Sequence, residues 1–182
     1  MNSVQSRNNM NLRRLLLIVM LSSAGGVSSA LVSRAAKLLA IVPLPYPIAG
    51  QFLSGLHVVW LILAAFLVKS KGSALMTGTL KGLVEVLFSQ SNVFVFLLSF
   101  TEGLVVEAVM GSLGRTRVVS IYLAGGLSSA SNLLIVGFFF LPPFPVFVYL
   151  VLFLVSFVSG VLFGGYLTNK IVKIIQNNNL SE

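Results

Sequence analysis

The amino-acid sequence predicts an all-α, polytopic membrane protein with six transmembrane helices. Its 182 residues are 57% hydrophobic and only 9% charged, and their mean hydropathy is +1.00. Soluble domains average about 25% charged residues, so this chain has too few charges to cover a water-facing surface. Apolar segments of about 20 residues, joined by short loops, use up its length. We therefore expect a single membrane domain over residues 1–182 and no soluble domain.

Each predicted span is an apolar run that ends at prolines, glycine or a polar cluster. The first run ends at the prolines that begin with Pro43, and the fifth meets Pro142, because proline cannot continue a regular helix. The second, third and fourth runs end at 69–72, 89–92 and 114–117. The approximate spans are 12–40, 48–68, 73–88, 93–113, 118–140 and 145–167, followed by a polar tail at 168–182.

Lysine and arginine are distributed unequally between alternate loops. Nine of them lie in the N-terminal arm, the second loop, the fourth loop and the tail. The other loops, around 41–47, 89–92 and 141–145, contain none, although Arg34 and Lys37 lie near the first. Because basic loops stay inside, this bias predicts a multi-pass protein of the cell membrane with both termini cytoplasmic. The nine residues are Arg7, Arg13, Arg14, Lys69, Lys71, Arg115, Arg117, Lys170 and Lys173.

Several function classes are not indicated by the sequence. The basic residues behind the net charge of +8 are scattered, so no nucleic-acid partner is expected. There is no P-loop, H-E-x-x-H or G-x-S-x-G pattern, and neither cysteine nor aspartate occurs, so nothing marks an enzyme, a cofactor or a metal site. Arg13, Arg14 and the apolar run Leu15–Leu21 also resemble a secretory signal. Because the rest of the chain is almost entirely hydrophobic, we expect an uncleaved first span.

Small residues form stripes that would let helix backbones approach each other in lipid. On the first span, Ser22, Gly26 and Ala30 share one face. This face either packs inside the protein or forms a flat docking face for another membrane subunit. The segments 24–30 and 124–130 have nearly the same sequence, which indicates either a duplicated unit or small residues recurring at helix contacts. A similar stripe on the fourth span contains Ser99, Gly103, Glu107 and Gly111.

Three of the four acidic residues lie inside predicted spans: Glu85, Glu102 and Glu107. Each costs roughly 2.5–3.5 kcal/mol to insert, so such residues usually face the bundle interior and mark a function. At about 1.5 Å of rise per residue, Glu85, Glu102 and His57 all lie in the outer half of the membrane. Polar groups from four helices converge there, which suits the capture of a polar small molecule. The predicted substrate-binding residues, including two aromatic ones, are Glu85, Glu102, His57, Asn132, Gln51, Trp60 and Tyr46.

Lys81 is an intramembrane cation with two candidate partners. Glu107 lies at a comparable depth on the neighbouring span, and together they would form a structural or coupling charge pair. Glu85 lies one helical turn away at i, i+4, and pairing with it would equally lower the free-energy cost of burying both charges in the membrane. The sequence leaves both pairings open.

Four short stretches carry a resemblance to a known family: Gly72-Ser-Ala-Leu75, Lys81-Gly-Leu-Val-Glu85, Glu102-Gly-Leu-Val-Val-Glu107-Ala108 and Leu123-Ala-Gly-Gly-Leu-Ser-Ser129. With them, residues 12–170 resemble the substrate-binding S component of energy-coupling-factor (ECF) vitamin transporters. The similarity is best to the YkoE-like branch, which is associated with thiamine or its hydroxymethylpyrimidine precursor. Glu102 departs from the family pattern, in which glutamine tends to precede this glycine. Its extra negative charge is compatible with a cationic thiazolium or a protonated pyrimidine.

The resemblance implies partners as well as a fold. A six-helix S component binds its vitamin from outside, and the first-span face of Ser22, Gly26 and Ala30 would contact a transmembrane coupling subunit. Two cytoplasmic ATPases would drive transport, which agrees with the missing P-loop. The proline-rich first loop with Tyr46 is similar to the family's gating loop over the substrate.

Two other functions stay open on the residues alone. The first is an ion- or proton-coupled small-molecule transporter, with the intramembrane glutamates as proton carriers. Its uptake would persist without ATPase partners and collapse with the proton gradient. The second is a membrane enzyme that uses glutamate and histidine as acid and base, and it would show turnover as a purified protein.

Overall fold

The computed structural model describes residues 2–39, 46–89, 93–139 and 144–179, and every regular element in these ranges is helical. The predicted all-α class is therefore confirmed. The last helical run has a π-helical segment, η1, between two α-helices. The elements are α1 (Asn2–Leu39), α2 (Tyr46–Val68), α3 (Ser73–Ser89), α4 (Phe94–Leu113), α5 (Val118–Phe139), α6 (Val146–Ser159), η1 (Gly160–Leu167) and α7 (Thr168–Asn179).

Five helical segments of the described chain are long and apolar enough to cross a membrane, counting α6, η1 and α7 as one. The chain is thus a multi-pass membrane protein. α3 has 17 residues, which is at the lower limit for a membrane span. Two boundaries differ from the predicted ones, because α1 begins at Asn2 instead of residue 12 and α7 makes most of the expected polar tail helical.

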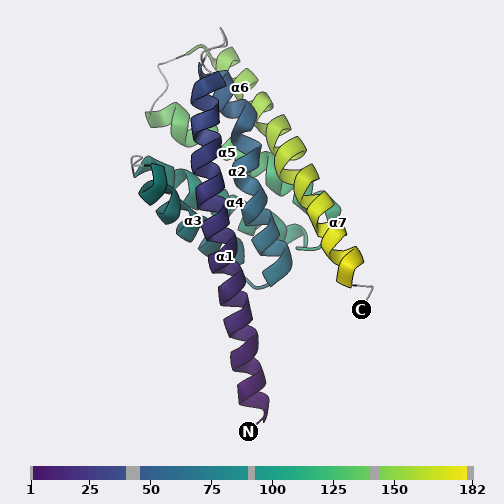
Figure 1. The fold of residues 1–182 in the computed structure, drawn as a ribbon. Coiled ribbons are helices and arrows are strands. Elements are labelled where there is room, and N and C mark those ends of the chain that lie inside the picture. The colour runs from purple at the N-terminus through teal and green to yellow at the C-terminus, as the bar shows by residue number, and fades with distance from the viewer. Residues whose placement is uncertain (1, 40–45, 90–92, 140–143, 180–182) are drawn as a thin grey trace.

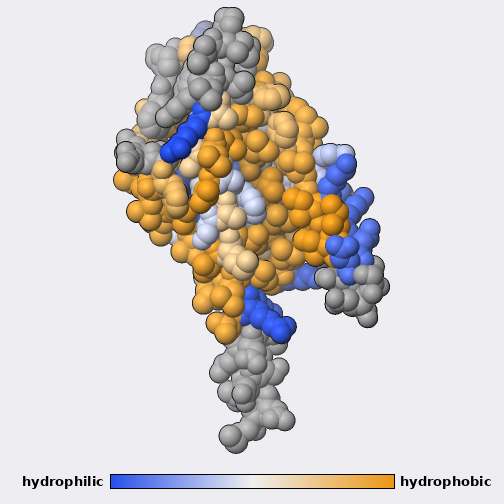
Figure 2. Space-filling model, in the orientation of Figure 1, coloured by the Kyte–Doolittle hydropathy of each residue, from blue (hydrophilic) through white to orange (hydrophobic). Residues whose placement is uncertain are grey.

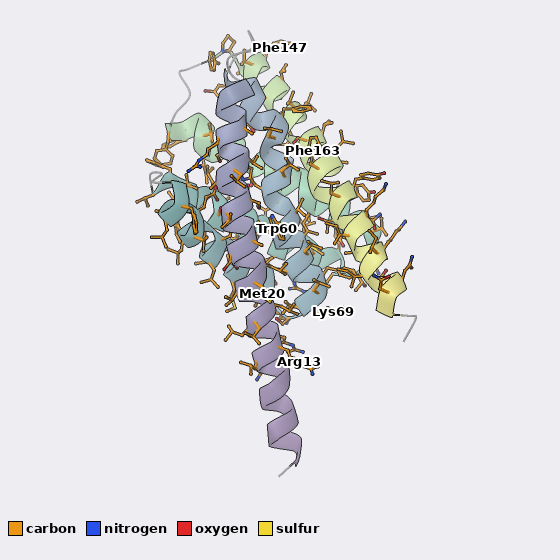
Figure 3. The ribbon with its side chains drawn as sticks, in the orientation of Figure 1. Arg13, Met20, Trp60, Lys69, Phe147 and Phe163 are labelled. Atoms are coloured by element: carbon orange, nitrogen blue, oxygen red, sulfur yellow. The ribbon has the colours of Figure 1, made fainter. Side chains whose placement is uncertain are left out.

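The two ends of the helical bundle differ in character. Figure 3 places Arg13 and Lys69 at one end and Phe147 at the opposite end. The first turns of α1 project beyond the other helices at the end marked by Arg13, and the C-terminus lies toward the same end (Figure 1). Figure 2 shows strongly hydrophilic residues gathered mainly there, while the visible face of the helices is mostly hydrophobic. Below, this end is called the basic end.

α2 is the central helix, since it contacts every other helical element of the described chain. A helix that is hydrophobic on all sides is stable only when it is surrounded by protein or lipid. Accordingly, the side chains of α2 from Val58 to Phe66 are buried apart from that of Trp60, which is partly exposed. They form the apolar core with residues of α3, α4, α5 and α7, namely Ala74, Val106, Met110, Ile121, Ala124 and Val172.

Two short connections at the basic end depend on glycine. Gly72 has a φ of 82° just before α3, and Gly114 has a φ of 102° just after α4. The backbone N–H of Gly114 donates to the carbonyl oxygen of Met110 and so closes the last turn of α4. Glycine adopts positive φ without steric cost, so both connections can turn sharply. α2 and α3, and α4 and α5, are thereby joined by the short segments 69–72 and 114–117.

Glycines on facing helices bring α3 and α4 into backbone contact. A Cβ added to Gly78 would lie 2.5 Å from the carbonyl oxygen of Ser99, and one added to Gly103 would lie 2.8 Å from that of Ala74. The stripe predicted on the fourth span is therefore a helix contact at Ser99 and Gly103. Gly111 does not belong to it, because a Cβ added there would meet nothing within 4 Å.

A second close contact joins α2, α5 and the last helical run. A Cβ added to Gly160 would overlap the carbonyl oxygen of Gly125, and one added to Gly55 would overlap that of Ser159. Beside these glycines, three buried hydroxyl groups from the three helices lie 2.6–3.3 Å from one another. We call this contact the glycine–serine seam, formed by Gly55, Gly125, Gly160, Ser54, Ser129, Ser156 and Ser159.

The small-residue face of α1 packs inside this chain. Ser22, Gly26 and Ala30 are all buried, and a Cβ added to Gly26 would lie 2.5 Å from the side chain of Val84 on α3. The Ser22 hydroxyl also lies 3.3 Å from the carbonyl oxygen of Thr77 on α3. The structure therefore corrects the expectation that this face contacts a partner subunit, because α3 already covers it. Larger residues form the exposed face of α1, among them Leu16, Met20, Val27 and Leu31.

Candidate functional site

A cavity of about 110 Å³ lies between α1, α2, α3, α4 and α5. Four of the seven residues predicted to bind substrate line it together: Glu85, Glu102, His57 and Asn132. The structure thus brings polar groups from four helices to one place, as the depth estimates predicted. The complete lining is Ser33, His57, Lys81, Glu85, Val95, Leu98, Ser99, Glu102 and Asn132.

Lys81 is the central charge of this cavity, and the residue is only 1% exposed. Its ammonium donates hydrogen bonds to Ser99 Oγ at 2.8 Å, Glu102 Oε2 at 3.2 Å and Glu85 Oε2 at 3.5 Å. An ammonium carries three protons, so each has an acceptor here. The i, i+4 pairing of Lys81 with Glu85 is confirmed, whereas the alternative pairing with Glu107 is wrong.

The packing of α3 on α4 explains how a lysine and two glutamates come together. Lys81 and Glu85 are one turn apart on α3, and Ser99 and Glu102 are nearly one turn apart on α4, so each pair shares a helix face. Gly82 has no side chain between them, and a Cβ there would lie 3.1 Å from Ser99 Cβ. This close approach lets the Lys81 ammonium reach α4. It also lets the Ser99 hydroxyl donate to Glu85 Oε2 at 3.1 Å.

Glu102 is bound from a second side by α5. Asn132 Nδ2 donates to Glu102 Oε1 at 2.6 Å, and the Ser128 hydroxyl donates to the Glu102 backbone carbonyl at 3.1 Å. One carboxylate oxygen thus accepts from α5 and the other from Lys81 on α3. The amide oxygen of Asn132 is buried and has no hydrogen-bond partner.

The other three predicted binding residues do not line the cavity. Gln51 is buried on α2 with its amide oxygen unpartnered. Trp60 lies farther along α2 toward the basic end and packs against Gly25 of α1, where a Cβ would lie 3.1 Å from the tryptophan side chain (Figure 3). Trp60 therefore does not line this cavity, and its role as an aromatic wall of a ligand site stays a prediction. Tyr46 begins α2, but its side chain lies outside the described part of the chain.

Glu107 has a different role at the basic end. Its carboxylate accepts hydrogen bonds from the backbone N–H groups of Gly72 at 2.7 Å and Ala74 at 3.1 Å, and it forms an ion pair with Arg115. The first N–H groups of a helix have no partner within the helix. Glu107 therefore caps the start of α3 from α4 and ties the α2–α3 connection to the α4–α5 connection.

Comparison with known proteins assigns a family. A family model described as the permease component of an ABC-type cobalt transport system matches residues 13–131. The chain belongs to this permease family. A search of curated proteins gives no match.

The permease also has a counterpart among solved structures. A crystal structure of an S-component of an ECF transporter superposes with a TM-score of 0.78 at 22% sequence identity, covering 92% of this chain and 86% of that chain. At this level of identity, the likeness establishes the fold of the permease.

The chemistry of the permease cavity bears on which ligands it can hold. In the described chain, no group of three or more His, Cys, Asp or Glu residues is placed to hold a metal ion. Both cavity carboxylates contact the Lys81 ammonium, which would oppose a divalent cation at the same oxygens.

Sequence reasoning missed part of the lining. Ser99 was assigned to helix packing, and Ser33 was not assigned to the site. The i, i+4 spacing of Lys81 and Glu85 was a usable signal for Lys81. No sequence signal marks Val95 and Leu98, since apolar residues occur on every face of these helices.

Proposed function

We propose that this permease is the substrate-binding S component of an ECF-type, ATP-driven importer. The observation that carries the proposal is the cavity that polar side chains line between α1 and α5, in a bundle that has the fold of an S component. In this proposal the chain has six spans and cytoplasmic termini, with the basic end inside. The cavity then lies in the outer half, where a ligand can enter from outside.

The proposed substrate is a thiamine-related compound or another small vitamin. Glu85, Glu102 and Asn132 would provide acceptors for N–H groups, and Val95 and Leu98 would cover an apolar ring face. An engineered apolar cavity of about 150 Å³ holds one benzene molecule. A cavity of about 110 Å³ therefore suits a single ring after slight widening. Its size favours the one-ring hydroxymethylpyrimidine precursor over two-ring thiamine.

The energy for transport would come from other subunits. This chain has no P-loop, so in this proposal it is not an enzyme, and two cytoplasmic ATPases act through a transmembrane coupling subunit. Because α3 covers the small-residue face of α1, the coupling subunit would meet the exposed face of α1 that carries Leu16, Met20, Val27 and Leu31.

The test is thermal stabilisation of the detergent-purified protein by a panel of vitamins, their precursors and Co²⁺. A ligand at 100 times its dissociation constant adds about 2.7 kcal/mol to the free energy of unfolding. We expect hydroxymethylpyrimidine to stabilise the protein at lower concentration than thiamine does, and Co²⁺ to have no effect. Stabilisation by Co²⁺ alone would contradict the proposal.

Substitution of the cavity carboxylates makes the same test specific to the site. We expect Glu85→Gln and Glu102→Gln each to weaken ligand binding at least tenfold, because a charged acceptor contributes about 1.5–3 kcal/mol. Glu107→Gln is the matched control, since that carboxylate caps α3 at the basic end and should leave affinity unchanged. Unchanged binding by both cavity variants would exclude this site.

One observation favours a second candidate, an ion- or proton-coupled transporter. Lys81, Glu85 and Glu102 form a cluster of buried titratable groups within the bundle. Uptake in proteoliposomes that hold this chain alone, lost when the proton gradient is collapsed, would favour this candidate over the S component.

A further inference from the structure

We propose that Asn132 is a specificity-determining residue whose amide oxygen, beside the Glu102 carboxylate, selects ligands that present two neighbouring N–H donors. An amidinium has such an edge, and so has an amino-substituted nitrogen heterocycle that is protonated on the ring nitrogen next to its amino group. This inference rests on the proposed function, because it names the chemical class of ligand for the same cavity.

The orientation of the Asn132 amide is fixed by Glu102. Asn132 is 8% exposed, and its Nδ2 donates to Glu102 Oε1 at 2.6 Å. Rotating the amide by half a turn would place its oxygen against a carboxylate oxygen, and neither atom can donate. The nitrogen therefore stays on Glu102, and the oxygen is directed away from it.

The Asn132 oxygen is a buried acceptor with no donor in the described chain. Leaving such a group unsatisfied costs about 1–3 kcal/mol, and folded proteins rarely do so. Among the described residues, the other unpartnered buried side-chain acceptors belong to Ser29, Gln51 and Thr168, none of which lines the cavity. Asn132 is thus the described cavity residue whose fully buried side-chain acceptor has no hydrogen-bond partner at all, and a ligand donor is the natural group to satisfy it.

Glu102 supplies the second acceptor. A carboxylate has about four lone-pair sites. The side-chain donors to Glu102 in the described chain are Asn132 Nδ2 and the Lys81 ammonium. Acceptor capacity therefore remains on Glu102, one hydrogen bond away from the Asn132 amide. Two acceptors placed next to each other are complementary to two N–H donors on neighbouring nitrogen atoms.

The experiment compares two probes that differ by one donor group: hydroxymethylpyrimidine, which carries an amino group on its ring, and the analogue with hydrogen in that place. Equilibrium binding of both is measured on the detergent-purified wild type, Asn132→Leu and Asn169→Leu. We expect the wild type to bind the amino compound at least tenfold more tightly. Asn132→Leu should lose this preference by binding the amino compound at least tenfold more weakly and the analogue less than threefold more weakly.

Asn169→Leu is the matched control. Asn169 is buried to nearly the same degree, at 9% exposed, but lies on α7 outside the cavity. It should keep the wild-type preference. If Asn132→Leu does not fold, the affinities of the wild type for the two probes still test the predicted preference for the amino compound.

With these two probes, two results would overturn the inference alone. One is equal affinity of the wild type for both probes. The other is an equal loss of affinity for both probes in Asn132→Leu, which would indicate that Asn132 has a structural role. Binding of other vitamins without the donor edge, in preference to the amino compound, would also overturn it while the S-component function stands. If no member of the vitamin panel binds the wild type, both the function and the inference fail.

Discussion

Two regions of this permease bury polar groups in the membrane in different ways. Around the cavity, α3, α4 and α5 contribute Lys81, Glu85, Glu102 and Asn132, which carry formal charges and a strong acceptor. At the glycine–serine seam, α2, α5 and the last helical run contribute uncharged hydroxyls between backbones in contact. The seam satisfies its hydroxyls internally, whereas the cavity leaves the Asn132 oxygen unpartnered.

The difference separates what holds the helices together from what can bind a ligand. In lipid, close backbone contact and modest hydrogen bonds associate helices, and the seam provides both without charge. Charged groups are not needed for that purpose, and each costs free energy to insert. The cavity region therefore contains polar groups that packing alone does not explain. Changes at the seam should alter stability alone, and changes at the cavity should alter stability and binding together.

The largest expected effect is that of Lys81→Met. Methionine has a similar length but leaves the Glu85 and Glu102 carboxylates without their ammonium partner. Removing one partner of a buried ion pair destabilises a protein by about 3–5 kcal/mol. We expect a loss of this size in the free energy of unfolding, measured by chemical denaturation in detergent micelles.

A second substitution shows whether the unpaired charge causes that loss. In Lys81→Met/Glu102→Gln, one carboxylate has been neutralised, so the double variant should be more stable than Lys81→Met alone. If it is less stable, the role of Lys81 is packing and not charge compensation. The cavity region would then not differ from the seam in how it buries its polar groups.

Gly160→Ala should have the next largest effect, and it tests the seam. The added Cβ would overlap the carbonyl oxygen of Gly125, so α5 and η1 must move apart. Overpacking of this kind costs about 1–3 kcal/mol. Gly111→Ala is the matched control, because the new Cβ meets nothing within 4 Å and alanine favours the helix. We expect Gly160→Ala to lower thermal stability and Gly111→Ala to preserve or raise it, with ligand affinity unchanged in both.

The fold was accessible from sequence because hydropathy determines where a chain can cross a membrane. Helix faces were harder to assign. The segments 24–30 and 124–130 are nearly identical, yet Gly26 packs on Val84 of α3 and Gly126 packs on Phe157 of α6. Small residues indicate that a contact exists but not which helix makes it, since any backbone can approach a glycine. For this reason the predicted docking face of α1 is an internal contact.

The sequence also predicted the candidate site in part. The depth of Glu85, Glu102 and His57 followed from helical rise, so their convergence could be predicted. The role of Glu107 could not be predicted, because its partners are the backbone N–H groups at the start of α3 and Arg115 in the α4–α5 connection. Backbone donors carry no sequence signal. The contact of Trp60 with Gly25 could not be predicted either, because Gly25 comes from a distant part of the chain.

The most direct comparison of the two regions makes the same substitution, serine to alanine, in both. Ser99→Ala removes a hydroxyl that accepts from the Lys81 ammonium and donates to Glu85, and hydrogen bonds to charged groups contribute about 1.5–3 kcal/mol. Ser54→Ala removes a hydroxyl whose partners are neutral, Ser129 and Ser156 among them. Neutral hydrogen bonds between membrane helices average about 0.6 kcal/mol.

Chemical denaturation of the two variants should therefore show a larger loss of stability for Ser99→Ala. Ligand affinity should fall only in that variant, since Ser99 lines the cavity and Ser54 does not. Equal losses, with equal affinities, would mean that the charges of the cavity do not strengthen its hydrogen bonds. Both regions would then serve helix packing, and the case for a ligand site between α3, α4 and α5 would lose its energetic basis.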